Sequence, residues 1–362
     1  LSAYEAKERA RLHLEARTAE VERLNTELAE KLDAIDSILA ATLVVDDYVD
    51  LASLRQSVVH PPFDRPDLTR VTPVPSALPI PPEPVYVEPP APEGIGAMFG
   101  GKKKHAAAIA DAQTAYWRQR QHWEKLMEEY QAAAARNDSA YQGKEARRIA
   151  DLAAAQARYE AECVQRRTEI LAANVQLEKL IRGLQERDPG ALEEYVSIVL
   201  NNSAYPECFE VEHDFEYDGT SRELTLVVHV PHPETLPTEK AFKYTKASDS
   251  ITSTPLPVKT RKDRYASAVS QVAIRTAHEI FEADRDGVVS TLSMTVGVPT
   301  IDPGTGQDTF VALVQLATDR ASFEALDLAR VDARATLDHL RAGVSKNPHD
   351  LVPIGNPRGV RG

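Results

Sequence analysis

The chain has 362 residues, 43% of them hydrophobic, and a formal net charge of -13 at pH 7. This length allows two domains, while the negative charge excludes broad adhesion to nucleic acid or anionic membranes, so any DNA contact must be local. Two cysteines, Cys163 and Cys208, are too few for a disulfide framework or a four-cysteine zinc site. We expect a cytoplasmic protein without a membrane segment, because no apolar run approaches about 18 residues.

Residues 1–58 combine many charged side chains with an apolar heptad repeat. Leu14, Val21, Leu28 and Ile35 recur every seven residues. This spacing predicts a coiled-coil helix, although a heptad repeat does not specify the partner. We expect this helix to pack as a third strand on the helical hairpin of residues 102–187, with a second copy of the chain as the alternative partner.

Residues 59–101 are rich in proline and glycine. Between Pro61 and Pro92 lie 12 of the chain's 24 prolines. Proline lacks a backbone N–H and fixes φ, which excludes a packed helix or a central strand and leaves extended polyproline II or irregular backbone. We expect this stretch to be a linker.

Residues 102–187 carry two runs of heptad spacing whose registers do not match. The expected coiled-coil seam consists of Ile109, Tyr116, Trp123, Tyr130, Ile149, Cys163, Ile170, Leu177 and Leu184. Between the two runs lie residues 136–139 and Gly143, which favour turns. The pattern predicts an antiparallel helical hairpin that associates with itself or with a protein partner. One unbroken helix of about 85 residues is the alternative, because local unwinding can absorb a stutter in the heptads.

Residues 188–352 differ in composition and predict an α+β domain with a mainly antiparallel sheet, followed by a flexible tail at 353–362. The fold class is therefore α plus α+β. The expected strands cover 208–217, 223–230, 241–245, 288–296 and 310–318, and the expected longer helices cover 261–283 and 332–341.

The sequence contains no recognisable catalytic motif. A nucleophile elbow is absent, and the histidines do not show a paired metal-ligand spacing. We therefore expect no catalytic residue, metal or cofactor.

The strongest chemical signal is a basic segment between Glu239 and Arg264. Its basic residues are Lys240, Lys243, Lys246, Lys259, Arg261, Lys262 and Arg264. Seven positive charges against three negative ones give +4 in a chain of net charge -13. Aromatic residues interleave with them, as suits phosphate contacts beside stacking surfaces, so we predict nucleic-acid or anion binding here. The alternative is a strand edge that lysines protect from pairing with other strands.

Several short strings resemble those of uncharacterised actinobacterial proteins, including the region that precedes the catalytic domain in some Mrr-like restriction endonucleases. Among them are Leu54-Arg55-Gln56, Lys243-Tyr244-Thr245-Lys246, Gln271-Val272-Ala273-Ile274-Arg275 and Val344-Ser345-Lys346-Asn347-Pro348. The resemblance implies a restriction or genome-defence setting.

An Mrr-like nuclease would carry a strand Asp followed by Glu or Gln-x-Lys, and this sequence has no convincing copy. We therefore expect a non-catalytic interaction or DNA-associated module. A restriction-type nuclease with an unrecognised active site and a purely structural coiled-coil scaffold are the alternatives.

Overall fold

The computed structural model describes residues 3–91 and 101–355. The chain forms two compact units, one built from residues 1–56 with 173–362 and the other from residues 57–172. The glycine-rich end of the expected linker and most of the expected tail lie outside the described residues. Within the described residues, no helix is both long and apolar enough to cross a membrane.

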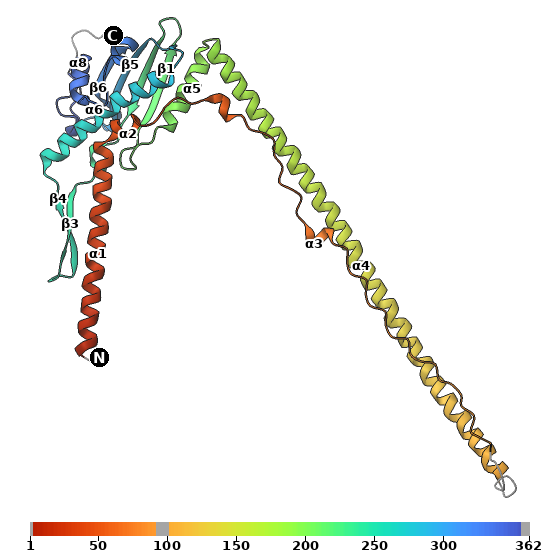
Figure 1. Ribbon diagram of the computed structural model, residues 1–362. Helices are drawn as coiled ribbons and strands as arrows, with labels where there is room; N and C mark the ends of the chain where they lie inside the picture. The colour runs from red at the N-terminus through yellow and green to blue at the C-terminus, as the bar shows by residue number, and fades with distance from the viewer. Residues whose placement is uncertain (1–2, 92–100, 356–362) are drawn as a thin grey trace. The chain divides into compact units, whose positions relative to one another are not determined.

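Figure 1 labels most of the helices and strands. The α-helices are α1 (Ala3–Asp36), α2 (Ile38–Thr42), α3 (Pro66–Thr69), α4 (Gly101–Gln185), α5 (Pro189–Asn202), α6 (Val258–Ala283), α7 (Arg320–Glu324) and α8 (Ala333–His339). Short 3-10 turns cover Leu51–Leu54, Pro233–Thr235 and Pro348–Asp350. The strands are β1 (Glu212–Asp218), β2 (Glu223–His229), β3 (Glu239–Thr245), β4 (Ser250–Pro255), β5 (Thr291–Ile301), β6 (Asp308–Asp319) and β7 (Gly343–Val344).

Five strands form one sheet in the order β1-β2-β5-β6-β7. Neighbouring strands are antiparallel except β2 and β5, which run parallel and are joined by a crossover that contains α6. The expected mainly antiparallel sheet with helices is confirmed. The strand expected at 241–245 forms as β3, which pairs with β4 in a separate two-stranded hairpin.

One face of the sheet belongs to the core that α6 also helps to form. Leu224, Leu226 and Val228 alternate along β2, are at most 1% exposed and share the core with α6 residues such as Val272 and Ile280. The residues between them point to the other face, as the two-residue period of a strand requires. This alternation is the sequence signal that made β2 predictable.

Helix α4 is continuous from Gly101 to Gln185, so the predicted antiparallel hairpin is wrong and the unbroken helix is found. Asn137, Asp138 and Gly143 all lie inside it. A helical glycine costs only about 1 kcal/mol relative to alanine, which the adjoining alanine-rich turns offset.

The half-buried residues of α4 keep to one stripe along the helix. The stripe includes Ile109, Tyr116, Trp123, Tyr130, Tyr141, Glu145, Arg148, Leu152, Tyr159, Cys163, Ile170, Leu177 and Leu184. A strict heptad drifts by about 20° per repeat on a straight helix, so a straight stripe needs a change of register. The change of register between the two heptad runs therefore keeps the half-buried residues on one stripe of a continuous helix. Ile149, at 54% exposed, is the predicted seam residue that lies off the stripe.

The proline-rich stretch covers part of this stripe. The indole N–H of Trp123 donates to the carbonyl of Pro81 at 3.0 Å, and the hydroxyl of Tyr159 donates to the carbonyl of Pro61 at 2.7 Å. Extended backbone has no internal hydrogen bonds, so its carbonyls are available to such donors. Within residues 57–172, the stripe thus serves an intramolecular contact.

Helix α1 packs against β3 and α6. Its apolar stripe is buried at Leu28 and Ile35, and Ile35 belongs to the main core. The prediction that α1 packs on a helical hairpin of residues 102–187 is therefore wrong, because α4 is one continuous helix. Helix α1 packs instead against the β-hairpin formed by β3 and β4.

Candidate nucleic-acid interface

The β3–β4 hairpin has one polar face that combines lysine with hydroxyl groups. Lys243 lies directly opposite Thr252 in the strand register, and both are exposed. The same face carries Ala241, Thr245, Ser250 and Thr254. This face presents a positive charge beside several hydrogen-bonding hydroxyls.

The opposite face of the hairpin is apolar and half-buried. It carries Phe242, Tyr244 and Ile251. The hydroxyl of Tyr244 donates to Asp249 at 2.9 Å, and the same carboxylate lies 2.8 Å from the Nε2 of His13 in α1. The apolar face is thus tied to α1, which leaves the lysine and hydroxyl face to solvent.

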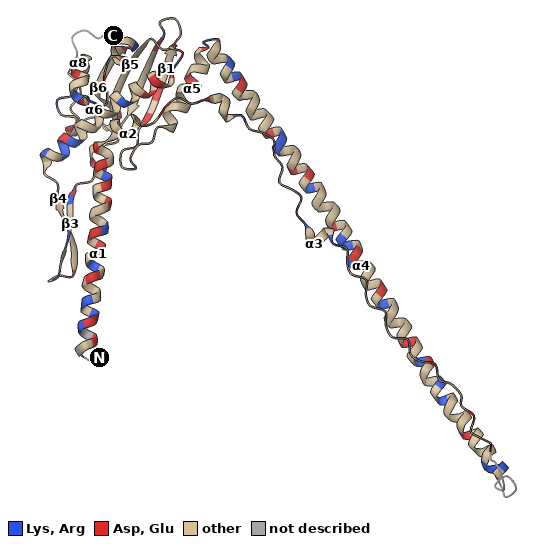
Figure 2. Ribbon diagram, viewed as in Figure 1, with Lys and Arg blue, Asp and Glu red and all other residues tan. Residues whose placement is uncertain are grey.

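The structure divides the seven predicted basic residues into two groups. Lys240, Lys243, Lys246 and Lys259 are exposed on β3, the hairpin turn and the first turn of α6. No ion pair to them occurs within residues 3–91 and 101–355. We call these four residues the hairpin lysines. In Figure 2 the ribbon is coloured blue, for Lys and Arg, on β3 and at the start of α6.

Two of the three remaining predicted residues form ion pairs within the protein. Arg264 forms a two-pronged ion pair with Asp36, at 2.8 and 2.9 Å, and Lys262 pairs with Asp350. Lys262 and then His349 lower the pKa of Asp350 to about 2. Arg261 is half-buried, and its Nε has no hydrogen-bond partner. The sequence alone could not separate the paired Lys262 and Arg264 from the exposed lysines.

An edge strand carries a row of carboxylates that bears on the nuclease alternative. Glu212, Asp214, Glu216 and Asp218 occupy the exposed side of β1. They do not converge on one point.

Within the described residues, one group of three side chains that could ligate a metal ion brings its potential ligand atoms together. The group consists of Asp47, His278 and Glu282. Sequence reasoning missed this group because Asp47 lies far along the chain from the other two. The available signal was the spacing of His278 and Glu282, which places them one helical turn apart on α6.

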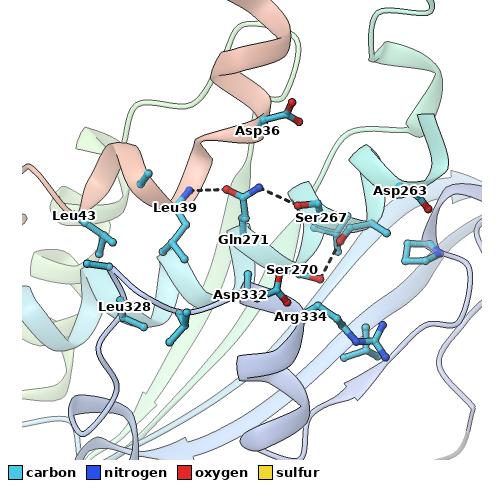
Figure 3. Close-up of a pocket in the computed structure, with 18 of the residues that line it drawn as sticks. Asp36, Leu39, Leu43, Asp263, Ser267, Ser270, Gln271, Leu328, Asp332 and Arg334 are labelled. Atoms are coloured by element: carbon cyan, nitrogen blue, oxygen red, sulfur yellow. Dashed lines mark hydrogen bonds between the residues drawn. The ribbon is translucent and has the colours of Figure 1, made fainter. Parts of the chain in front are cut away.

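A cavity of about 710 Å³ lies between α2, α6 and α8 (Figure 3). Two of the polar residues that line it, Gln271 and Asp332, are already engaged by the fold. Gln271 accepts from the backbone N–H of Leu39 at 3.1 Å and donates to Ser267 at 3.2 Å, and Asp332 accepts from the N–H of Ala335 as a helix cap. The cavity is therefore explained as a crevice between packed helices.

No family model, curated protein or solved structure matches this chain.

Proposed function

We propose that this protein is a non-catalytic interaction module that contacts nucleic acid through its β3–β4 hairpin. The observation that carries the proposal is the exposed face on which Lys243 stands opposite Thr252, flanked by further hydroxyls. Lysine, serine and threonine side chains are common donors to phosphate oxygens.

Charge supports a local contact rather than a broad one. The hairpin lysines offer four positive charges in a chain of net charge -13. Like-charge repulsion between the rest of the protein and DNA opposes binding, so we expect weak affinity whose shallow salt dependence reflects only the few phosphates that the hairpin lysines neutralise. The expected contact is to the backbone, with little sequence preference.

The setting proposed for this contact is a restriction or genome-defence assembly. Its support is the resemblance of short strings such as Lys243-Tyr244-Thr245-Lys246 to the region preceding the catalytic domain of Mrr-like endonucleases. That string begins on β3 and ends in the turn after it, within the proposed contact surface.

Fluorescence anisotropy with labelled duplex and single-stranded DNA tests the proposal. The variant Lys240→Glu/Lys243→Glu/Lys246→Glu should bind far more weakly than the native protein. A matched control, Lys125→Glu/Lys144→Glu/Lys179→Glu, makes the same charge change at exposed positions of α4. The control should weaken binding far less. Equal losses in the two variants, or no binding by the native protein at low salt, would refute the hairpin as the contact.

A second candidate function is self-association through α4. Trp117, Ile149, Val164, Leu171 and Val175 are between 53% and 65% exposed. At about 100° per residue these side chains fall on one side of the helix, separate from the half-buried stripe. Val164→Glu with Leu171→Glu should then convert a dimer to a monomer in light scattering. A native protein that is monomeric at high concentration would exclude this function.

A further inference from the structure

Asp47, His278 and Glu282 come together from two segments of the chain. His278 and Glu282 lie one turn apart on α6, and Asp47 lies in the segment that follows α2. The backbone N–H of Asp47 donates to Glu282 Oε2 at 3.1 Å, which holds the two segments together. One potential ligand atom from each residue lies within 4.8 Å of those of the other two.

We propose that these three residues form a binding site for a divalent transition metal ion, with zinc as the best fit. The Nε2 of His278 and the Oε2 of Glu282 are 3.7 Å apart, which is too long for a hydrogen bond. Bonds of about 2.0 to 2.2 Å in a tetrahedral zinc site place ligand atoms roughly 3.3 to 3.6 Å apart. The observed separation is close to that of two ligands of one ion.

Buried polar atoms without partners give independent support. The Nε2 atom of His278 is buried and has no hydrogen-bond partner. Glu279, beside it, is 0% exposed, and its Oε2 is also unpaired. The other oxygen of Glu279 lies 3.2 Å from the hydroxyl of Thr42, which is itself 3.0 Å from Asp47 Oδ2. A single hydroxyl proton cannot serve both carboxylates, and of the two the Arg275 guanidinium reaches only Glu279, so among the described residues Asp47 has no cationic side chain bonded to it.

The balance of charge around the site favours a dication. Asp47, Glu279 and Glu282 supply three carboxylates, and Arg275, bonded to Glu279 at 2.6 Å, supplies one positive charge. The fully ionised group therefore carries two uncompensated negative charges. A bound divalent cation would offset these two charges.

The donor set distinguishes among cations. One imidazole with two carboxylates suits zinc and similar transition metals, whereas magnesium and calcium prefer oxygen ligands throughout. His278 and Glu282 also line a cavity of about 380 Å³, which leaves room for water or another small ligand in a fourth position. The ion would cross-link the segment after α2 to α6, independently of any DNA contact.

Isothermal titration of the full chain with zinc chloride tests this site. The native protein should bind one equivalent, and His278→Gln and Asp47→Asn should each bind at least about 100-fold more weakly, because even loss of a supporting residue costs 10- to 100-fold. The control His339→Gln alters an exposed histidine of α8 and should bind as the native protein does. Circular dichroism of each variant establishes that the fold is retained.

Two further arms make the result decisive. Glu282→Gln preserves side-chain shape and should also lose zinc, so the test does not depend on one substitution. Parallel titrations with manganese and magnesium chloride should give weaker binding than zinc. No saturable zinc binding by the native protein, or native-like binding by His278→Gln, would overturn the site. Tighter binding of magnesium than of zinc would overturn the assignment to a transition metal.

Discussion

The side-chain amide of Asn25 in α1 bonds both backbone groups of Phe242 in β3. Its nitrogen donates to the Phe242 carbonyl at 3.1 Å, and its oxygen accepts from the Phe242 N–H at 2.7 Å. β3 pairs with β4 along its other edge. One side chain of α1 therefore occupies the edge of β3 that would otherwise offer unpaired backbone groups to another strand.

Replacing Asn25 by Leu should loosen the hairpin from α1. Each lost hydrogen bond is worth about 1 kcal/mol, so the Phe242 amide should exchange its hydrogen roughly 10-fold faster or more. Asn201→Leu, which removes an amide that bonds within α5, serves as the control. Unchanged exchange at Phe242 in Asn25→Leu would show that the contact does not hold the hairpin in place.

A buried ion pair on α6 should contribute strongly to the stability of the unit formed by residues 1–56 and 173–362. Arg275 and Glu279 are 4% and 0% exposed, and the Arg275 guanidinium also donates to Ser203 at 2.8 Å and lies 4.3 Å from the Tyr205 ring centroid. Arg275→Met should lower the free energy of unfolding by about 3–5 kcal/mol in urea, because it leaves the buried carboxylate of Glu279 without its positive partner. The double variant with Glu279→Leu should recover much of this loss. Simple additivity of the two single effects would contradict the account.

Tyr159 is expected to fix the proline-rich stretch on α4. Its ring meets that of Phe63 edge-on at 5.5 Å, and its hydroxyl bonds Pro61. Tyr159→Phe loses only the hydrogen bond, whereas Tyr159→Ala also loses the ring contact, worth about 0.5–1.5 kcal/mol beyond its buried area. Limited proteolysis within 57–91 should accelerate in the order native, Phe, Ala. Val164→Ala, an exposed change on the same helix, should have no effect.

The stability of the first unit should fall in acid partly through His213. Burial, then the nearby His229 and Arg275, lower its pKa from 6.5 to about 4, while Asp214 opposes the shift. Above pH 6.5 the residue is neutral in both states. Below 6.5 the unfolded chain takes up the proton first, so stability is lost as pH falls toward about 4.

By about pH 5 this loss should amount to about 2 kcal/mol. Urea unfolding of the native protein and of His213→Gln at about pH 7.5 and about pH 5 measures it. The variant should lose about 2 kcal/mol less than the native protein over this interval. Identical losses would show that His213 does not set the acid response.

The sequence predicted those parts of the fold whose signals are local. Helix α6 was expected over 261–283 and begins three residues earlier, at Val258. The alternation of Leu224, Leu226 and Val228 likewise identified β2. Such periodicities depend on one element facing one core, which a single sequence records directly.

Features that depend on partners were not recoverable in the same way. The stripe on α4 looked like a coiled-coil seam, because a heptad pattern does not reveal that Pro81 and Pro61 supply the contacts. The charge of the basic segment was visible, but the ion pair of Arg264 with Asp36 spans distant parts of the chain. The carboxylate of Asp47 beside His278 was missed for the same reason.

The salt dependence of duplex binding tests the central proposal most directly. If the four hairpin lysines contact phosphates, log K against log salt should fall with a slope of about -3 to -4, since each neutralised phosphate contributes about 0.9. Lys240→Glu/Lys243→Glu/Lys246→Glu should flatten the slope by about 3, and the matched α4 variant should leave it nearly unchanged. A native slope near zero, or an equal change in both variants, would contradict nucleic-acid contact by the hairpin.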